Sequence, residues 1–169
     1  HCSYYSKYSL EHLFARCGFQ VEKLYEAYEG QFLCIEAKPS LDPAPPQLDP
    51  AELVGDLAAF AQRYAAKSEN ERSELRRLHD ENKSVVVWGS GSKGITFLNM
   101  LGLQEQIKYA VDINPRKQGK FITGAGQEII APERLKEYEP DTVIVMNPVY
   151  IEEIKSIMSS MGLSANYVT

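Results

Sequence analysis

The sequence has no long apolar run, no dense block of Lys and Arg, and no cysteine pair at a metal-binding spacing. No run approaches the roughly 20 apolar residues that span a bilayer, so we expect no membrane partner. The chain has 18 Lys and Arg against 23 Asp and Glu, a net charge of −5 at pH 7. Because an acidic surface repels phosphate backbones, we expect no nucleic-acid partner.

The cysteines are few and unpaired by pattern. Cys2, Cys17 and Cys34 match no metal-ligand spacing, and their number is odd. We therefore predict free thiols, no metal site and a cytoplasmic protein. No secretory signal is recognisable near the start, and the chain begins with His1 rather than Met, which we interpret as part of a longer protein.

Residues 1–38 predict a helix followed by two strands. Ser9 stands where a helix N-cap would, apolar residues then recur at helical spacing, and Gly18 ends the pattern. Two β-like runs follow, Phe19–Tyr25 and Gln31–Ala37, with a short glycine-containing loop between them. This order indicates a helix and then an antiparallel hairpin.

A proline-rich segment separates this region from a long helix. Five prolines among residues 39–50 exclude a regular helix or a central strand and indicate an extended linker. Residues 51–80 then predict a single helix with an apolar stripe in its first half. Its second half is heavily charged, and we expect its apolar residues Leu75 and Leu78 to contact the next domain.

Residues 84–169 alternate between strand and helix patterns, within a predicted domain of residues 51–169. The predicted strands are Ser84–Trp88, Ile107–Val111, Glu128–Ile130, Thr142–Met146 and Ala165–Val168, and the predicted helices are Gly94–Leu101, Pro132–Glu137 and Ile151–Met161. The strands are continuously apolar, which is typical of strands buried on both faces. The fold class is therefore α/β, a Rossmann-like open and mostly parallel sheet with flanking helices.

A glycine-rich turn follows the first of these strands. It consists of Gly89, Ser90, Gly91, Ser92, Lys93 and Gly94, and has the form G-x-G-x-x-G between a strand and a helix. In that geometry the first glycine permits a tight turn, the second lets the backbone approach a phosphate, and the third lets the helix pack on the strand. The start of the helix also offers free N–H groups to an anion.

Polar residues fall just past the ends of the other strands. Asp112 ends the next strand, at the place where dinucleotide-binding folds carry an acid, and Asn114 and Asn147 follow strand ends as well. The loop Asn114–Lys120 adds three cations that could contact an anion. These positions predict a ligand crevice, although a glycine turn that only closes a strand–helix junction would show the same spacing.

These motifs resemble those of a known enzyme family. Trp88–Gly94, Phe97–Asn99, Val111–Lys120 and Asn147–Tyr150 with Glu152–Ile154 look like the C-terminal domain of S-adenosylmethionine (SAM)-dependent C-methyltransferases. The best understood members act on nucleotide-linked deoxysugars. The likeness runs from about residue 52 to the end of the chain.

The first segment resembles the tail of the class I methyltransferase domain of the same enzymes, where the sheet closes with an antiparallel hairpin. In that family a histidine at the position of His1 is the base that removes a proton beside a sugar ketone, and the resulting enolate attacks the SAM methyl group. The resemblance thus implies catalytic roles for His1, Tyr4 and Tyr5. A histidine is a suitable base near neutral pH, and tyrosines can orient a substrate oxygen.

The chain also departs from the family pattern. The cysteine-rich zinc module, the SAM-binding half of the methyltransferase domain and the glutamate before His1 are missing. We therefore expect SAM to be bound by the missing N-terminal part, with no cofactor in this chain and no activity of this chain alone. The rest of the methyltransferase chain is the expected protein partner.

The resemblance leads to a prediction for the whole enzyme: transfer of methyl to a carbon of a small substrate, a sugar nucleotide. This chain would help to bind or cover that substrate through the glycine turn, Asp112, Asn114, Asn147 and Tyr150. Two alternatives stay open. One is an NAD-type oxidoreductase domain, and the other is a non-catalytic packing or dimerisation module.

Overall fold

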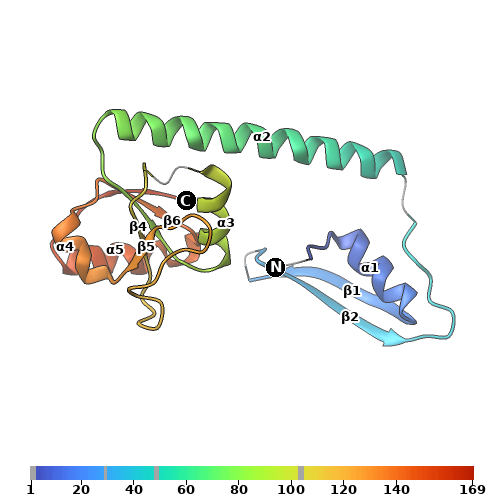
Figure 1. The fold of residues 1–169 in the computed structure, drawn as a ribbon. Coiled ribbons are helices and arrows are strands. Elements are labelled where there is room, and N and C mark those ends of the chain that lie inside the picture. The colour runs from blue at the N-terminus through green and yellow to red at the C-terminus, as the bar shows by residue number, and fades with distance from the viewer. Residues whose placement is uncertain (1–2, 29, 48–49, 103–104) are drawn as a thin grey trace. The chain divides into compact units, whose positions relative to one another are not determined.

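The computed structural model describes residues 3–28, 30–47, 50–102 and 105–169 (Figure 1). The chain divides into two compact units, residues 1–61 and 62–169. Among the described residues, no helix is both long and apolar enough to cross a membrane. The predicted division into residues 1–38, 39–50 and 51–169 stays a prediction.

The first unit begins with helix α1, Lys7–Arg16. The expectation that Ser9 is its N-cap is wrong, because Ser6 has that role. The Ser6 hydroxyl accepts from the Ser9 N–H at 3.2 Å, and the Ser9 hydroxyl accepts from the Ser6 N–H at 2.9 Å. Since this reciprocal pair satisfies two otherwise free N–H groups, the helix starts earlier than the apolar pattern alone indicates.

The predicted hairpin is present as strands β1, Phe19–Ala27, and β2, Phe32–Pro39. The strands pair antiparallel over their whole length, with a bulge between Val21 and Lys23. In the described part of this unit, the only buried hydrophobic residue is Ala15. This unit therefore buries little apolar surface of its own, and its hairpin is supported by packing with helix α1.

Helix α2, Pro50–Asp80, joins the second unit through its charged half. As expected from the sequence, Leu75 is buried and Leu78 packs beside it against the core. The Arg72 guanidinium donates to the carbonyl oxygens of Met100 at 2.8 Å and Leu101 at 3.3 Å. These carbonyls lie at the end of helix α3, Ser92–Leu101, so α2 satisfies acceptors that have no partner within that helix.

The second unit is an open α/β sheet, which confirms the predicted fold class (Figure 1). Its strands are β3 (Val85–Trp88), β4 (Tyr109–Val111), β5 (Glu128–Ile130), β6 (Thr142–Val145) and β7 (Asn166–Val168). They are all parallel and lie in the order β5-β4-β3-β6-β7. The helical elements are α3 (Ser92–Leu101), η1 (Pro132–Arg134), α4 (Leu135–Tyr138), η2 (Pro148–Tyr150) and α5 (Ile151–Ser160).

The core of this unit lies on both faces of the sheet. On one face Val85 and Val87 pack with Leu98 of α3, and on the other Val86 and Trp88 pack with residues of α4 and α5. Successive residues of a strand point to opposite faces, so the four residues of β3 contribute side chains to the core on both faces of the sheet. This explains why the sequence of β3 is continuously apolar.

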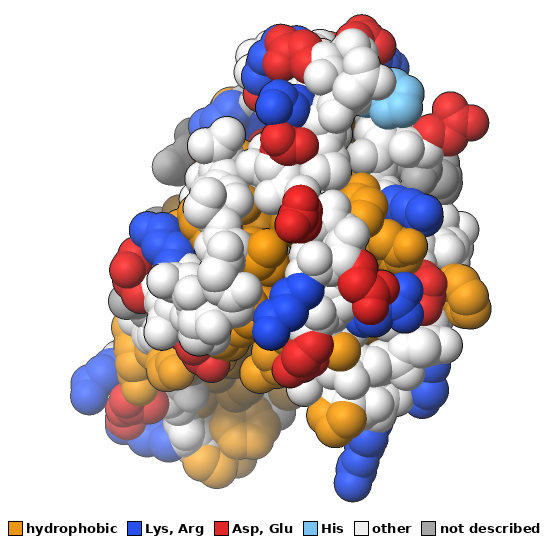
Figure 2. All heavy atoms as spheres, turned by 90° about the vertical axis from the view of Figure 1, so that its left-hand side faces the viewer, with side chains coloured by type: hydrophobic (Ala, Val, Ile, Leu, Met, Phe, Trp, Pro, Cys, Tyr) orange, Lys and Arg blue, Asp and Glu red, His pale blue; other side chains and the backbone are white. Residues whose placement is uncertain are grey.

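Charged side chains of both signs are interspersed on the face seen in Figure 2. Two exposed ion pairs lie in the helical elements of this unit: Arg134 of η1 with Glu137 of α4 at 3.4 Å, and Lys155 with Glu152 within α5 at 2.8 Å. Exposed pairs of this kind contribute about 0–1 kcal/mol each. This face therefore has no field of a single sign.

Asp141 ties the starts of β3 and β6 together. Its carboxylate accepts from the Lys83 ammonium at 2.9 Å and from the Ser84 N–H at 2.8 Å. The hydrogen bond from Lys83, followed by those from Ser84, lowers the pKa of Asp141 to about 2. The folded pKa thus lies below the unfolded value of about 3.9, so this contribution to stability is complete above about pH 4.

We expect Asp141→Asn to reduce stability at neutral pH and to change its acid dependence. The difference in urea midpoint between wild type and variant should shrink as the pH falls from about 4 towards 2, because protonation then removes the same carboxylate from the wild type. Urea unfolding curves at a series of pH values measure this. A difference that stays constant over that range would contradict the role of Asp141.

Candidate functional site

The glycine turn adopts the geometry that its spacing predicts. Gly89 has φ +115°, a conformation that favours glycine. A Cβ on Gly94 would lie 2.0 Å from the carbonyl oxygen of Gly89, so helix α3 can pack this closely only with glycine there. A Cβ on Gly91, by contrast, would meet nothing within 4 Å. The second glycine therefore leaves open space at the turn.

Helix α3 begins at this turn without a side-chain cap. Gly91 is the N-cap residue and supplies no side-chain acceptor to the first turn. The first N–H groups of an α-helix have no partner within the helix, and the positive end of its dipole is located there. Lys93 adds a positive charge in the same turn, so this end of α3 favours an anion.

A pocket of about 530 Å³ lies at the carboxyl ends of β3, β4 and β6. Strand β3 has β4 on one side and β6 on the other, so the chain reverses its direction of winding at this point. Open α/β sheets bind ligands in the crevice outside such a switch point. The strand order within this unit corresponds to the first five strands of the doubly wound dinucleotide-binding order.

The pocket brings together most of the predicted binding residues. Those that line it are Gly89, Gly91, Ser92, Lys93, Gly94, Asp112, Asn147 and Tyr150. Ser90 and Asn114 do not line it, and neither do the three cations of the loop that follows Asn114. The role of all these residues in ligand binding stays a prediction.

The sequence interpretation missed the apolar wall of the pocket and one acid. The additional lining residues are Trp88, Ile113, Val145, Met146, Glu153, Ile154 and Ile157. Three of them, Trp88, Ile113 and Met146, adjoin predicted residues at strand ends. Glu153 and Ile157 are one helical turn apart on α5, so the helical spacing of α5 was the signal that could have found them.

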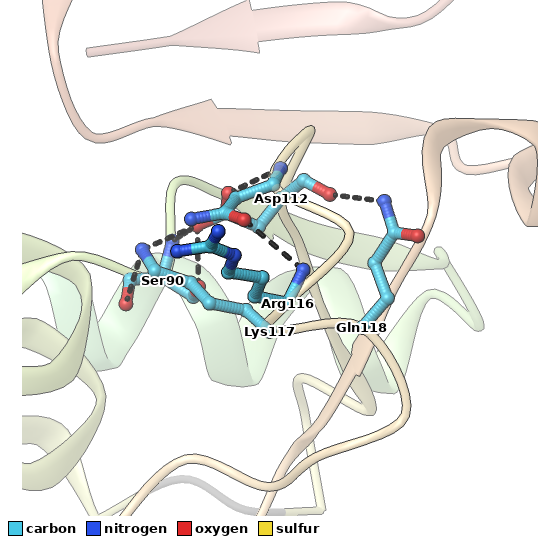
Figure 3. Close-up of polar contacts among 6 residues, drawn as sticks. Ser90, Asp112, Arg116, Lys117 and Gln118 are labelled. Carbon is cyan, nitrogen blue, oxygen red and sulfur yellow. Dashed lines mark hydrogen bonds and ion pairs between the residues drawn. The ribbon is translucent and has the colours of Figure 1, made fainter.

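Asp112 lies at the pocket but is engaged by its own chain (Figure 3). Its Oδ2 accepts from the Ser90 N–H at 3.1 Å, from the Ser90 hydroxyl, and from the Lys117 ammonium at 2.9 Å. Its Oδ1 accepts from the Asn114 N–H at 2.9 Å, and its carbonyl oxygen accepts from the Gln118 side chain at 2.9 Å. The carboxylate thus links the glycine turn to the loop after β4.

The charge of Asp112 is stabilised in place. Burial is the largest influence and by itself would raise the pKa of this carboxyl. The hydrogen bonds from Ser90, Lys117 and Asn114 together outweigh burial and hold the pKa below its ordinary value. Asp112 is therefore ionised at neutral pH and is compensated by Lys117.

Tyr4 and Tyr5, the described residues with implied catalytic roles, lie in the first unit. His1 is outside the described residues. Tyr4 and Tyr5 are exposed by 78% and 51%. Their catalytic assignment stays a prediction.

We expected free thiols and no metal site from the sequence. Cys17 and Cys34 are free, whereas Cys2 lies outside the described residues. In the described part of the chain, no three His, Cys, Asp or Glu residues gather in a group that could hold a metal ion.

The fold and the pocket define a doubly wound α/β domain with a ligand crevice at its switch point. Residues 52–165 match the family described as the C-methyltransferase C-terminal domain, and the chain belongs to this family. The chain is also 28% identical over 167 residues to the C-methyltransferase NovU of Streptomyces niveus, covering 91% of this chain and 40% of that protein. It thus spans less than half the length of this relative.

Two solved structures show a more distant likeness. A Rex-family repressor, RSP, has a TM-score of 0.38 and 19% identity over 56% of this chain and 49% of its own. The UDP-D-quinovosamine 4-dehydrogenase of Vibrio fischeri has a TM-score of 0.39 and 21% identity over 52% of this chain and 78% of its own. These scores are too low to carry conclusions about the site.

Proposed function

We propose that this chain is part of a SAM-dependent C-methyltransferase that methylates a carbon of a small nucleotide-sugar substrate. The role of this chain is to hold the nucleoside diphosphate part of that substrate in the switch-point pocket. The observation that carries the proposal is the combination, in one pocket, of the open space at Gly91, the uncapped start of α3 and Lys93. The family membership and the similarity to NovU support the methyltransferase assignment.

The two ends of the pocket suit different parts of such a ligand. A diphosphate would accept from the N–H groups at the start of α3 and lie near the Lys93 ammonium. The apolar wall, which includes Trp88 and Ile157, would cover a flat nucleobase. Asn147 and Tyr150 supply polar groups beside that wall, where they would orient the ligand.

We infer that this pocket is not the SAM site of the enzyme. SAM carries a cationic sulfonium, whereas the start of α3 with Lys93 favours an anion. The acid that would bind the SAM ribose at this position is Asp112, which already accepts from Ser90 and Lys117. We therefore propose that SAM binds to the rest of the enzyme. His1, Tyr4 and Tyr5 of this chain would contribute to the catalytic centre beside that cofactor.

Calorimetry on the 169-residue chain tests this role. We expect thymidine 5′-diphosphate to bind with a dissociation constant in the micromolar range and SAM to give no measurable heat. Lys93→Met should weaken the nucleotide about fivefold to tenfold, since a charge-assisted contact is lost. Lys136→Met removes the same charge from α4, outside the pocket, and should leave the affinity unchanged.

A second variant tests the space at the turn. Gly91→Val places a branched side chain where nothing lies within 4 Å, so the fold should survive while the phosphate position is blocked. The thermal midpoint should fall by only a few degrees, from the poorer N-cap, while nucleotide affinity falls at least about tenfold. Tight SAM binding, or full nucleotide affinity in Gly91→Val, would contradict the proposal.

The NAD-type alternative is less well supported. In such a domain Asp112 would bind a ribose, but its carboxylate already accepts from Ser90 and Lys117. NAD well above a micromolar dissociation constant would raise the thermal midpoint if that alternative held. A packing module would be favoured by a crevice filled with side chains, and the crevice instead has a volume of about 530 Å³.

A further inference from the structure

Asp112 occupies the position of the acid that binds a ribose in dinucleotide-binding folds, but its hydrogen bonds are to residues of its own chain. Such an acid accepts from ribose hydroxyls, which requires free carboxylate oxygens pointing into the crevice. Here four donors from three residues of the same chain already lie on the two oxygens, and three of them are on Oδ2. The residue is 8% exposed.

The same contacts fix the floor and the edge of the pocket. Ser90 is the second residue of the glycine turn, so its N–H and hydroxyl hold that turn against β4. The Asn114 N–H and the Lys117 ammonium hold the loop after β4 on the same carboxylate, and the Gln118 side chain holds the Asp112 carbonyl (Figure 3). Ile113, which lines the pocket and is 59% exposed, lies between two of these anchored residues.

We propose that Asp112 is a positioning residue of this pocket and not a ligand of the ribose 2′-hydroxyl, so that the pocket binds 2′-deoxyribonucleoside and ribonucleoside diphosphates with equal affinity. This inference rests on the proposed nucleotide-binding role. It assigns selectivity to the diphosphate end and the apolar wall. The sugar ring between them is held without its 2′-hydroxyl.

A matched pair of ligands measures the contribution of that hydroxyl. Thymidine 5′-diphosphate and 5-methyluridine 5′-diphosphate differ only at the 2′ position, and titration of each into the 169-residue chain gives their dissociation constants. We expect the two to agree within about threefold. A carboxylate that accepted the 2′-hydroxyl would favour the ribonucleotide by about tenfold or more.

Asp112→Asn separates positioning from direct contact. The amide keeps the shape of the side chain but puts a donor or a neutral acceptor where Ser90 and Lys117 now donate to a charge. We expect both nucleotides to weaken by the same factor, about threefold to tenfold, with their ratio unchanged. Unchanged affinities for both nucleotides would overturn the positioning role, and loss confined to the ribonucleotide would show that Asp112 binds the 2′-hydroxyl.

The outcomes distinguish the two levels of the hypothesis. Binding of neither nucleotide to the wild-type chain overturns the proposed function, and this inference with it. Binding of both with a tenfold preference for the ribonucleotide, or selective loss in Asp112→Asn, overturns the inference alone. The wild-type ratio by itself decides the question if the variant does not fold.

Discussion

Replacing Gly94 with alanine should strongly destabilise the α/β unit. The added Cβ would lie 2.0 Å from the Gly89 carbonyl oxygen and 3.1 Å from its carbonyl carbon, which are backbone atoms of the same turn. Neither can move without shifting β3 or α3, both of which are anchored in the core through residues such as Val87 and Leu98. We expect a loss of about 3 kcal/mol or more.

Thermal unfolding with a matched control measures this effect. A loss of that size should lower the midpoint by about 10 °C or more. Gly91→Ala changes the same turn by the same methyl group, but its Cβ would meet nothing within 4 Å. We expect it to cost at most about 1 kcal/mol, because alanine is a poorer N-cap than glycine. Equal losses in the two variants would show that the close approach of α3 to the turn does not control stability.

Replacing Leu75 with alanine should detach the charged half of α2 from the sheet. Leu75 is 2% exposed and packs in the same cluster as Val85, Leu98 and Leu101. A buried Leu→Ala change costs about 2–5 kcal/mol, through lost burial and the cavity that remains. The rest of this half of α2 is mostly exposed, so few other apolar contacts can compensate.

Leu57→Ala is the control on the same helix. Leu57 is 59% exposed and lies outside the two core clusters, so its truncation should change stability by about 0.5 kcal/mol or less. Urea unfolding followed by far-ultraviolet circular dichroism compares the two variants. A loss below about 1 kcal/mol for Leu75→Ala would mean that α2 is not part of the cooperative unit.

The elements of the α/β unit were predictable because their signals are local. Continuous apolar runs, a glycine turn and the spacing of α5 gave strands and helices whose ends differ from the structure by only a few residues. The start of α1 was misplaced because two serines compete for the N-cap, and only the reciprocal bonding of Ser6 and Ser9 decides between them. The strand β4 is shorter than expected, starting at Tyr109, although Ile107 is buried in the core.

The site was predictable in its outline but not in its chemistry. The glycine turn, Asp112, Asn147 and Tyr150 do surround one pocket. That Ser90 points to Asp112, and that Lys117 neutralises the same carboxylate, depends on the path of a loop between parallel strands. No spacing rule describes that path. The sequence therefore could not distinguish a residue that binds a ribose from one that holds the glycine turn and the loop after β4 together.

By itself, the sequence determined the fold class, the glycine turn and the family of this protein. All three depend on residue type and spacing along the chain, since φ at Gly89 and the burial of β3 follow from local composition. Only the tertiary structure decided which polar groups face the pocket and which are hydrogen-bonded to other residues of the chain. The hydrogen bonds from Ser90 to Asp112 join residues 22 positions apart in the chain, and their geometry is set by the packing of β4 beside β3.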